Sequence, residues 1–118
     1  MRAKDSLGRY GEDLAAAHLQ AVGLQVLERN WRCRMGEIDI VAIDGDCLVV
    51  CEVKTRQSVT AGAPLEAVTR VKLGRLRRLA AAWLADHDRH FPRIRIDVIG
   101  ILRPARGQIV LEHLKWVS

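Results

Sequence analysis

Two stretches of the chain repeat apolar side chains every three to four residues, as the buried face of a helix does. The first predicts a helix over residues 7–22, which Gly23 ends. The second predicts a helix over about residues 65–86, with Pro64 in its first turn after a loop of small residues over 57–63. Between these helices, and after the second, the apolar pattern changes to that of strands.

Five runs rich in β-branched or aromatic residues are predicted to be strands. They cover residues 24–31, 37–44, 47–55, 94–102 and 108–114. The turn sequence Asp44-Gly45-Asp46 joins the second and third runs in a β-hairpin. The order of one helix, three strands, one helix and two strands predicts the α/β class, with a mixed sheet of about five strands and helices packed on it.

The predicted hairpin carries charges inside its strands, where charge is normally costly. The charged residues are Glu37, Asp39, Glu52 and Lys54. If Gly45 and Asp46 form a two-residue turn, Asp39 lies directly opposite Glu52 on the returning strand. Strict alternation of side chains would also place Ile38 on the same face as Ile40.

Two facing carboxylates repel each other unless a positive group lies between them. A divalent cation fits this place, because Mg²⁺ binds one or two carboxylates while water and substrate phosphate complete its shell. Lys54 follows Glu52 on the same face, where its amine is placed to orient or deprotonate an attacking water. The alternative left open is an ordinary ion pair between Lys54 and one of the acids. Apolar residues on both faces of the hairpin predict that it is covered from both sides.

Two further charged residues occupy positions expected to be buried. The apolar stripe of the second predicted helix contains Lys72, whose amine reaches either the rim of the domain or the acidic pair. Its predicted neighbours on the stripe are Leu65, Val68, Leu76, Leu79 and Trp83. Asp97 shares a strand face with Arg95 and is expected to reach a backbone or arginine partner, which favours a structural role over a catalytic one.

The composition and net charge of the chain indicate what kind of partner it binds. The 118 residues suffice for one domain, and their net charge of +5 favours a polyanion, with nucleic acid as the leading candidate. Arginines flank the hairpin in sequence and are candidate contacts to a nucleic-acid backbone, with solvated strand ends as the alternative: Arg29, Arg32, Arg34 and Arg56. The longest apolar run, residues 79–85, is far shorter than the ~20 residues that span a bilayer. Three cysteines without a C-x-x-C pair suit a cytoplasmic protein.

Four segments of the chain resemble the YraN-like uncharacterised protein family. They are residues 8–41, which end in "GEIDIV", then "VVCEVKTR", "AVTRVKLGRL" and "RIDVIG". Within them, E-I-D followed by E-V-K is similar to the D…(D/E)-x-K metal site of the PD-(D/E)XK nuclease superfamily. The resemblance implies a restriction-endonuclease-like fold, related to that of Holliday-junction resolvases, in a single nuclease-like domain over residues 1–118.

The resemblance also implies roles for individual residues. Asp39 and Glu52 are expected to be metal ligands, with the Val53 carbonyl as a further ligand, and Lys54 is expected to be the catalytic lysine. Glu12 matches an acid that some of these nucleases add from their first helix, although a solvated acid is the alternative. The match around Lys72 favours a position near the acidic pair, among the candidate nucleic-acid-binding residues.

Three functional hypotheses follow. The first is an endonuclease dependent on Mg²⁺ or Mn²⁺ that hydrolyses phosphodiester bonds, with structured or branched DNA preferred to RNA and a homodimer expected because one such site cuts one strand. The second is a non-catalytic nucleic-acid-binding module, and the third is a scaffold subunit. No G-x-S-x-G, P-loop or Rossmann motif occurs in the sequence, so serine or nucleotide-cofactor chemistry is not favoured.

Overall fold

A computed structural model describes residues 6–58 and 62–117. The described part contains the predicted order of helices and strands. Helix α1 (Ser6–Ala21) precedes strands β1 (Gln25–Cys33), β2 (Gly36–Asp44) and β3 (Cys47–Arg56). A 3₁₀ turn, η1 (Pro64–Ala67), and helix α2 (Arg70–Asp86) lead to strands β4 (Arg93–Leu102) and β5 (Val110–Leu114). None of the described helices has the length and hydropathy of a membrane-spanning segment.

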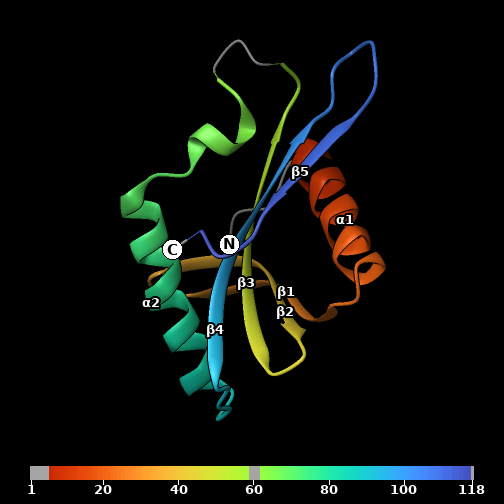
Figure 1. The fold of residues 1–118 in the computed structure, drawn as a ribbon. Helices are drawn as coiled ribbons and strands as arrows, with labels where there is room; N and C mark the ends of the chain where they lie inside the picture. The colour runs from red at the N-terminus through yellow and green to blue at the C-terminus, as the bar shows by residue number, and fades with distance from the viewer. Residues whose placement is uncertain (1–5, 59–61, 118) are drawn as a thin grey trace.

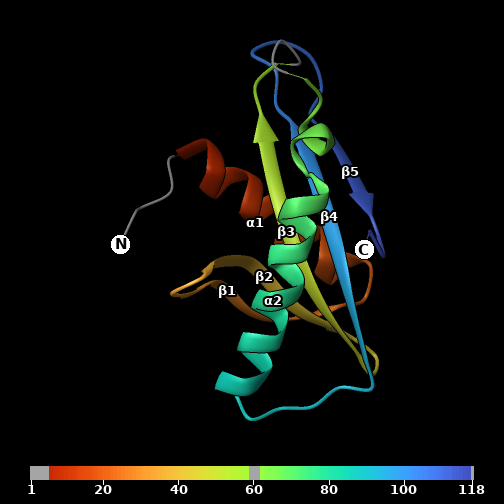
Figure 2. The same ribbon diagram turned by 90° about the vertical axis from the view of Figure 1, so that its left-hand side faces the viewer.

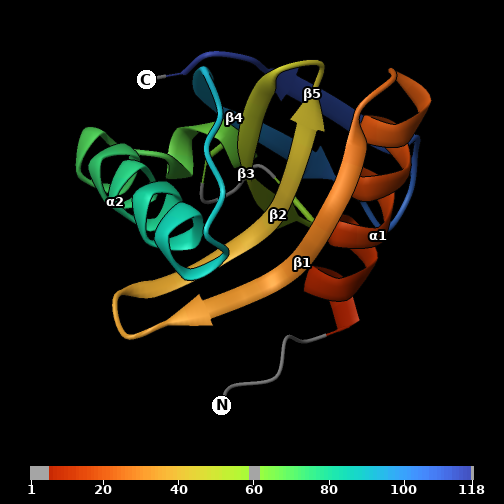
Figure 3. The same ribbon diagram turned by 90° about the horizontal axis from the view of Figure 1, so that it is seen from below.

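The strands form one mixed sheet in the order β1-β2-β3-β4-β5. Strands β3 and β4 are parallel, and the other neighbouring pairs are antiparallel. Helix α1 covers one face of the sheet and α2 covers the other, as Figures 1, 2 and 3 show from three directions. The predicted α/β class is therefore confirmed, and the architecture is consistent with a restriction-endonuclease-like fold.

Each helix buries an apolar cluster against its own face of the sheet. On the α1 side, Ala15 and Leu19 pack with residues of the central strands, including Val49 and Ile99. On the α2 side, Leu79 and Trp83 pack with another set: Ile38, Val41, Leu48, Val50 and Ile96. Because the two clusters sandwich β2 and β3, the hairpin is covered on both faces as predicted.

Helix α2 begins later than the sequence pattern indicates. Thr69 is its N-cap, with extended backbone angles and a side chain that accepts a hydrogen bond from the Lys72 backbone N–H at 3.3 Å. Leu65 lies before this cap, in the separate turn η1. The prediction that Leu65 and Val68 extend the apolar stripe of the helix is therefore wrong, because the capping threonine starts the helix at Arg70.

The contact between α1 and β3 predicts the effect of one substitution. A Cβ atom at Gly11 would collide with Oγ1 of Thr55 and lie 3.0 Å from its Cβ, so we expect Gly11→Ala to destabilise the fold by about 1–3 kcal/mol. Gly74, on α2, is the matched control, because the nearest contact of an added Cβ there is Arg78 Nη1 at 3.7 Å. Gly74→Ala should raise stability by roughly 0.5–1 kcal/mol. Urea unfolding of both variants tests this packing, and equal losses would contradict it.

A polar network is buried beneath α1, where β4 meets β5. Asp97 is fully buried and accepts hydrogen bonds from Arg95 Nε at 3.0 Å and Nη2 at 3.2 Å, which confirms the predicted arginine partner. His113 Nε2 lies 2.8 Å from Asp97 Oδ2, and its Nδ1 lies 3.0 Å from His18 Nε2 on α1. The network therefore links the helix to two strands.

His18 should make folding stability depend on pH. Burial, together with the nearby His113 and Lys115, lowers the pKa of His18 below its ordinary value of 6.5. The unfolded chain therefore binds a proton at His18 more readily than the folded chain does, and the free energy of unfolding should fall as the pH drops through and below 6.5. Unfolding at about pH 7.5 and about pH 5.5 measures this slope, and His18→Gln should flatten it. An unchanged slope would show that His18 does not contribute.

Candidate functional site

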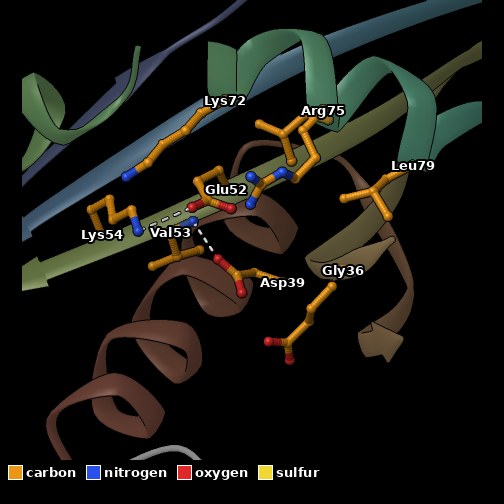
Figure 4. Close-up of a pocket in the computed structure, with 10 residues that line it drawn as sticks. Gly36, Asp39, Glu52, Val53, Lys54, Lys72, Arg75 and Leu79 are labelled. Atoms are coloured by element: carbon orange, nitrogen blue, oxygen red, sulfur yellow. Dashed lines mark hydrogen bonds and ion pairs between the residues drawn. The ribbon is translucent and has the colours of Figure 1, made fainter. Parts of the chain in front are cut away.

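The site begins where β2 and β3 separate. Their antiparallel ladder runs from Asp44 and Cys47 at the turn to Ile40 and Cys51, which confirms the predicted two-residue turn. The ladder ends there, so the predicted direct pairing of Asp39 with Glu52 is wrong. Instead, the Val53 backbone N–H donates a hydrogen bond to Asp39 Oδ2 at 2.8 Å (Figure 4). A side-chain carboxylate thus replaces the backbone acceptor that β2 no longer supplies.

The alternation of faces along β2 changes at the same place. Ile38 packs in the cluster under α2 with Val41, whereas Ile40 packs in the cluster under α1. The prediction that Ile38 and Ile40 share a face is therefore wrong, because the chain changes its orientation around Asp39. Asp39 lies between the two isoleucines with 6% exposure, and its carboxylate is directed to the backbone of β3.

A cavity of about 360 Å³ occupies the space between the separated strands and α2. Its lining combines the predicted acids and lysines with apolar residues of the helix: Gly36, Glu37, Asp39, Glu52, Val53, Lys54, Lys72, Arg75, Leu76 and Leu79. Figure 4 shows Asp39, Glu52 and Lys54 converging around Val53, while Lys72 and Arg75 approach from the helix. Folding therefore brings the two predicted acids and both predicted lysines to one cavity.

The charged groups of β3 are in direct contact on the cavity wall. Lys54 Nζ lies 3.2 Å from Glu52 Oε2, and their side chains are 27% and 17% exposed. A solvent-accessible amine beside a carboxylate can exchange protons with a bound water. Lys72 lines the acidic cavity from α2, so of its two predicted positions the structure shows the one near the acids.

The oxygen atoms of this cavity suit a hard divalent cation. Asp39 and Glu52 provide carboxylates, and the Val53 carbonyl faces the same side of β3 as its N–H, toward the gap that β2 leaves. Within residues 6–58 and 62–117, no three His, Cys, Asp or Glu side chains form a group able to hold a metal ion. The chain thus offers a partial shell, which is how Mg²⁺ is commonly bound, with water and phosphate oxygens supplying the rest.

Two of the other predicted residues lie on the α1 side. Glu12 is 2% exposed, so the alternative of a solvated acid is wrong, but Glu12 is not among the residues that line the cavity. Arg29 Nη2 lies 3.8 Å from Glu12 Oε1 and 2.7 Å from Asp13 Oδ1. Arg29 is thereby held to α1 by two acids.

The remaining arginines lie at strand ends. Arg32 and Arg34 line a second cavity of about 460 Å³ at the turn between β1 and β2, which shares Gly36 and Glu37 with the first. Arg56 lies at the end of β3, where its carbonyl accepts a hydrogen bond from the Arg103 N–H at 2.8 Å.

The sequence analysis did not single out Arg75, which also lines the first cavity. Its position three residues after Lys72 on α2 was the available signal, because residues three apart share a helix face.

Comparison with known proteins places the chain in a family. The model of the uncharacterised protein family UPF0102 matches residues 11–101. A UPF0102 protein of Kineococcus radiotolerans is 58% identical over 100% of this chain and 98% of its own length. UPF0102 proteins of Beutenbergia cavernae and Streptomyces griseus subsp. griseus are 59% and 58% identical, with both chains fully covered in each case. The chain therefore belongs to the UPF0102 family.

Proposed function

We propose that this protein is an endonuclease, dependent on Mg²⁺ or Mn²⁺, that hydrolyses phosphodiester bonds of nucleic acid, DNA in preference to RNA. The observation that carries the proposal is the hydrogen bond from Val53 to Asp39. It bridges β2 and the continuing β3 just beyond the end of their ladder, where two carboxylates, a backbone carbonyl and Lys54 surround one open cavity. The fold, which is consistent with that of restriction endonucleases, supports the same activity.

Each side chain has a proposed task. Asp39 and Glu52 would hold the cation, with the Val53 carbonyl as a further ligand. When bound, such an ion polarises the phosphate and lowers the pKa of a coordinated water. Lys54 would orient the attacking water and, as a neutral amine, accept its proton, while Lys72 and Arg75 would bind phosphate oxygens from α2. Arg32, Arg34 and Arg56 would contact the flanking backbone, and Glu12 helps to hold Arg29 at α1.

A cleavage assay tests this function. Branched, flapped, single-stranded and duplex DNA, with matching RNA, are incubated with the protein and Mn²⁺ or Mg²⁺. We expect cleavage that chelation abolishes and Asp39→Asn removes. A parallel melting experiment should show Tm rising with Mn²⁺ concentration for the wild type but not for Asp39→Asn, because a ligand that binds the folded state stabilises it. No cleavage of any substrate, together with an unchanged Tm, would refute the proposal.

A nucleic-acid-binding module and a scaffold subunit are the two non-catalytic candidates, and one observation favours a structural role for Lys54 in either. Lys54 is already ion-paired with Glu52, as the structural interpretation of the hairpin predicted. Binding of DNA in gel-shift assays without cleavage would support the binding module. The absence of both binding and cleavage would favour the scaffold role. For the nuclease we also propose that two copies act on the two strands, and sedimentation with a duplex substrate tests that stoichiometry.

A further inference from the structure

The two adjoining cavities share a wall that contains an acid without a role in the proposed reaction. Glu37 lines both the cavity with Asp39 and Glu52 and the cavity at the β1–β2 turn. It is the cross-strand partner of Arg32, whose Nε lies 3.7 Å from Glu37 Oε2. At that distance the two charged groups form an ion pair. The Arg32 side chain is 32% exposed, so a ligand can reach it, whereas Oε2 of the 26% exposed Glu37 is buried against it.

The charges of the first cavity give Glu37 a possible task. The lining has three acidic and three basic side chains: Glu37, Asp39, Glu52, Lys54, Lys72 and Arg75. Without Glu37 the basic groups outnumber the acidic ones, which disfavours a divalent cation. Glu37 nevertheless belongs to no group of three potential ligands in the described chain. Glu37, the acid that makes the numbers of acidic and basic groups in the first cavity equal, therefore faces the guanidinium of Arg32, which lines the second cavity.

We infer that Glu37 is a third acid of the metal site, held aside by Arg32 until a backbone phosphate of the nucleic acid binds Arg32. A phosphate can compete for Arg32, because it accepts two parallel short hydrogen bonds from the guanidinium fork, whereas Glu37 Oε2 lies 3.7 Å from Arg32 Nε. Glu37 is then free to turn toward Asp39 and Glu52 and to strengthen cation binding. Nucleic acid and metal thereby raise each other's affinity, since coupling between two ligands is reciprocal. This inference rests on the proposed function and adds a regulation of its site.

The test measures metal binding rather than cleavage. Mn²⁺ is titrated by calorimetry into the Lys54→Ala protein, which prevents turnover, with and without a short DNA duplex. We expect the duplex to tighten Mn²⁺ binding by at least about fivefold. Glu37→Gln should remove this gain. Arg32→Gln should tighten Mn²⁺ binding in the absence of DNA, because it releases Glu37, and should leave little further gain when DNA is added.

Arg34→Gln is the matched control, since Arg34 lines the same cavity but is not the cross-strand partner of Glu37. It should weaken DNA binding and preserve the coupling. Unchanged or weaker Mn²⁺ binding in Arg32→Gln would overturn the inference while leaving the metal site intact, provided that Asp39→Asn still abolishes Mn²⁺ binding. If the unsubstituted chain binds no Mn²⁺, the proposed function fails together with the inference.

Discussion

Replacing Lys54 by alanine is expected to lower the rate of phosphodiester cleavage by about 10²–10⁴-fold, the usual contribution of a positioned acid or base. The amine lies 3.2 Å from Glu52 on the wall of the acidic cavity, where an attacking water would be oriented. Stability should change by no more than about 1 kcal/mol, because a partly exposed ion pair is weak. Single-turnover cleavage at saturating Mn²⁺ and DNA measures the rate, and thermal melting checks the fold.

Lys72→Ala is the matched control for this experiment. Lys72 lines the same cavity but approaches from α2, and in the proposed function it binds phosphate rather than the water. We expect a weaker apparent affinity for DNA with a smaller effect on the rate at saturation. If Lys54→Ala cleaves as fast as the wild type, Lys54 serves only as the ion-pair partner of Glu52. Equal rate losses in both variants would show that charge alone, rather than position, is what the cavity requires.

The hairpin shows how far local sequence rules predict this site. The turn at Gly45 and Asp46 and the register up to Ile40 and Cys51 follow from turn chemistry and alternation, because each pair is fixed by its neighbours. These rules cannot predict where two strands separate, since separation depends on helices packed on both faces. Asp39 was therefore placed opposite Glu52, when it actually bonds to the Val53 backbone. The carboxylate of Asp39 nevertheless lines the cavity, so the wrong pairing did not change which acids form the site.

Contacts between distant segments were predictable only in part. Lys72 on an apolar stripe indicated that α2 brings a charge toward the sheet, because a lysine there needs a polar destination. Glu37 and Arg75 also line the cavity, because α2 packs close to the β1–β2 turn. The sequence pattern alone does not predict that packing. Helical periodicity likewise missed the start of α2, where a single threonine cap overrides the apolar pattern. Local patterns therefore indicated the chemistry, and tertiary packing decided which groups meet.

Tertiary packing also decides how much a charged residue matters in the network around Asp97. A substitution there has the largest expected effect on stability. Asp97→Asn should lower the free energy of unfolding by about 3–5 kcal/mol, because it leaves the buried guanidinium of Arg95 without its main counter-charge. Asp97 is fully buried, and the Arg95 side chain is 6% exposed. The amide would also direct N–H donors at neighbouring donors, including the Trp116 backbone N–H that now bonds to Asp97 at 3.3 Å. Thermal melting should show Tm falling by roughly 10–20 °C.

An exposed pair between the start of β4 and the β2–β3 turn shows why burial, rather than charge, sets this cost. Arg93 Nη2 lies 2.8 Å from Asp46 Oδ1, a distance as short as those in the buried network, but both side chains are 59% exposed. Asp46→Asn should therefore leave stability nearly unchanged, because water solvates Arg93 when its partner is removed. Arg95 keeps Asp44 at 2.9 Å after the loss of Asp97, which limits the damage but does not abolish it. Similar losses from Asp97→Asn and Asp46→Asn would show that the Asp97 network adds nothing beyond an ordinary surface pair.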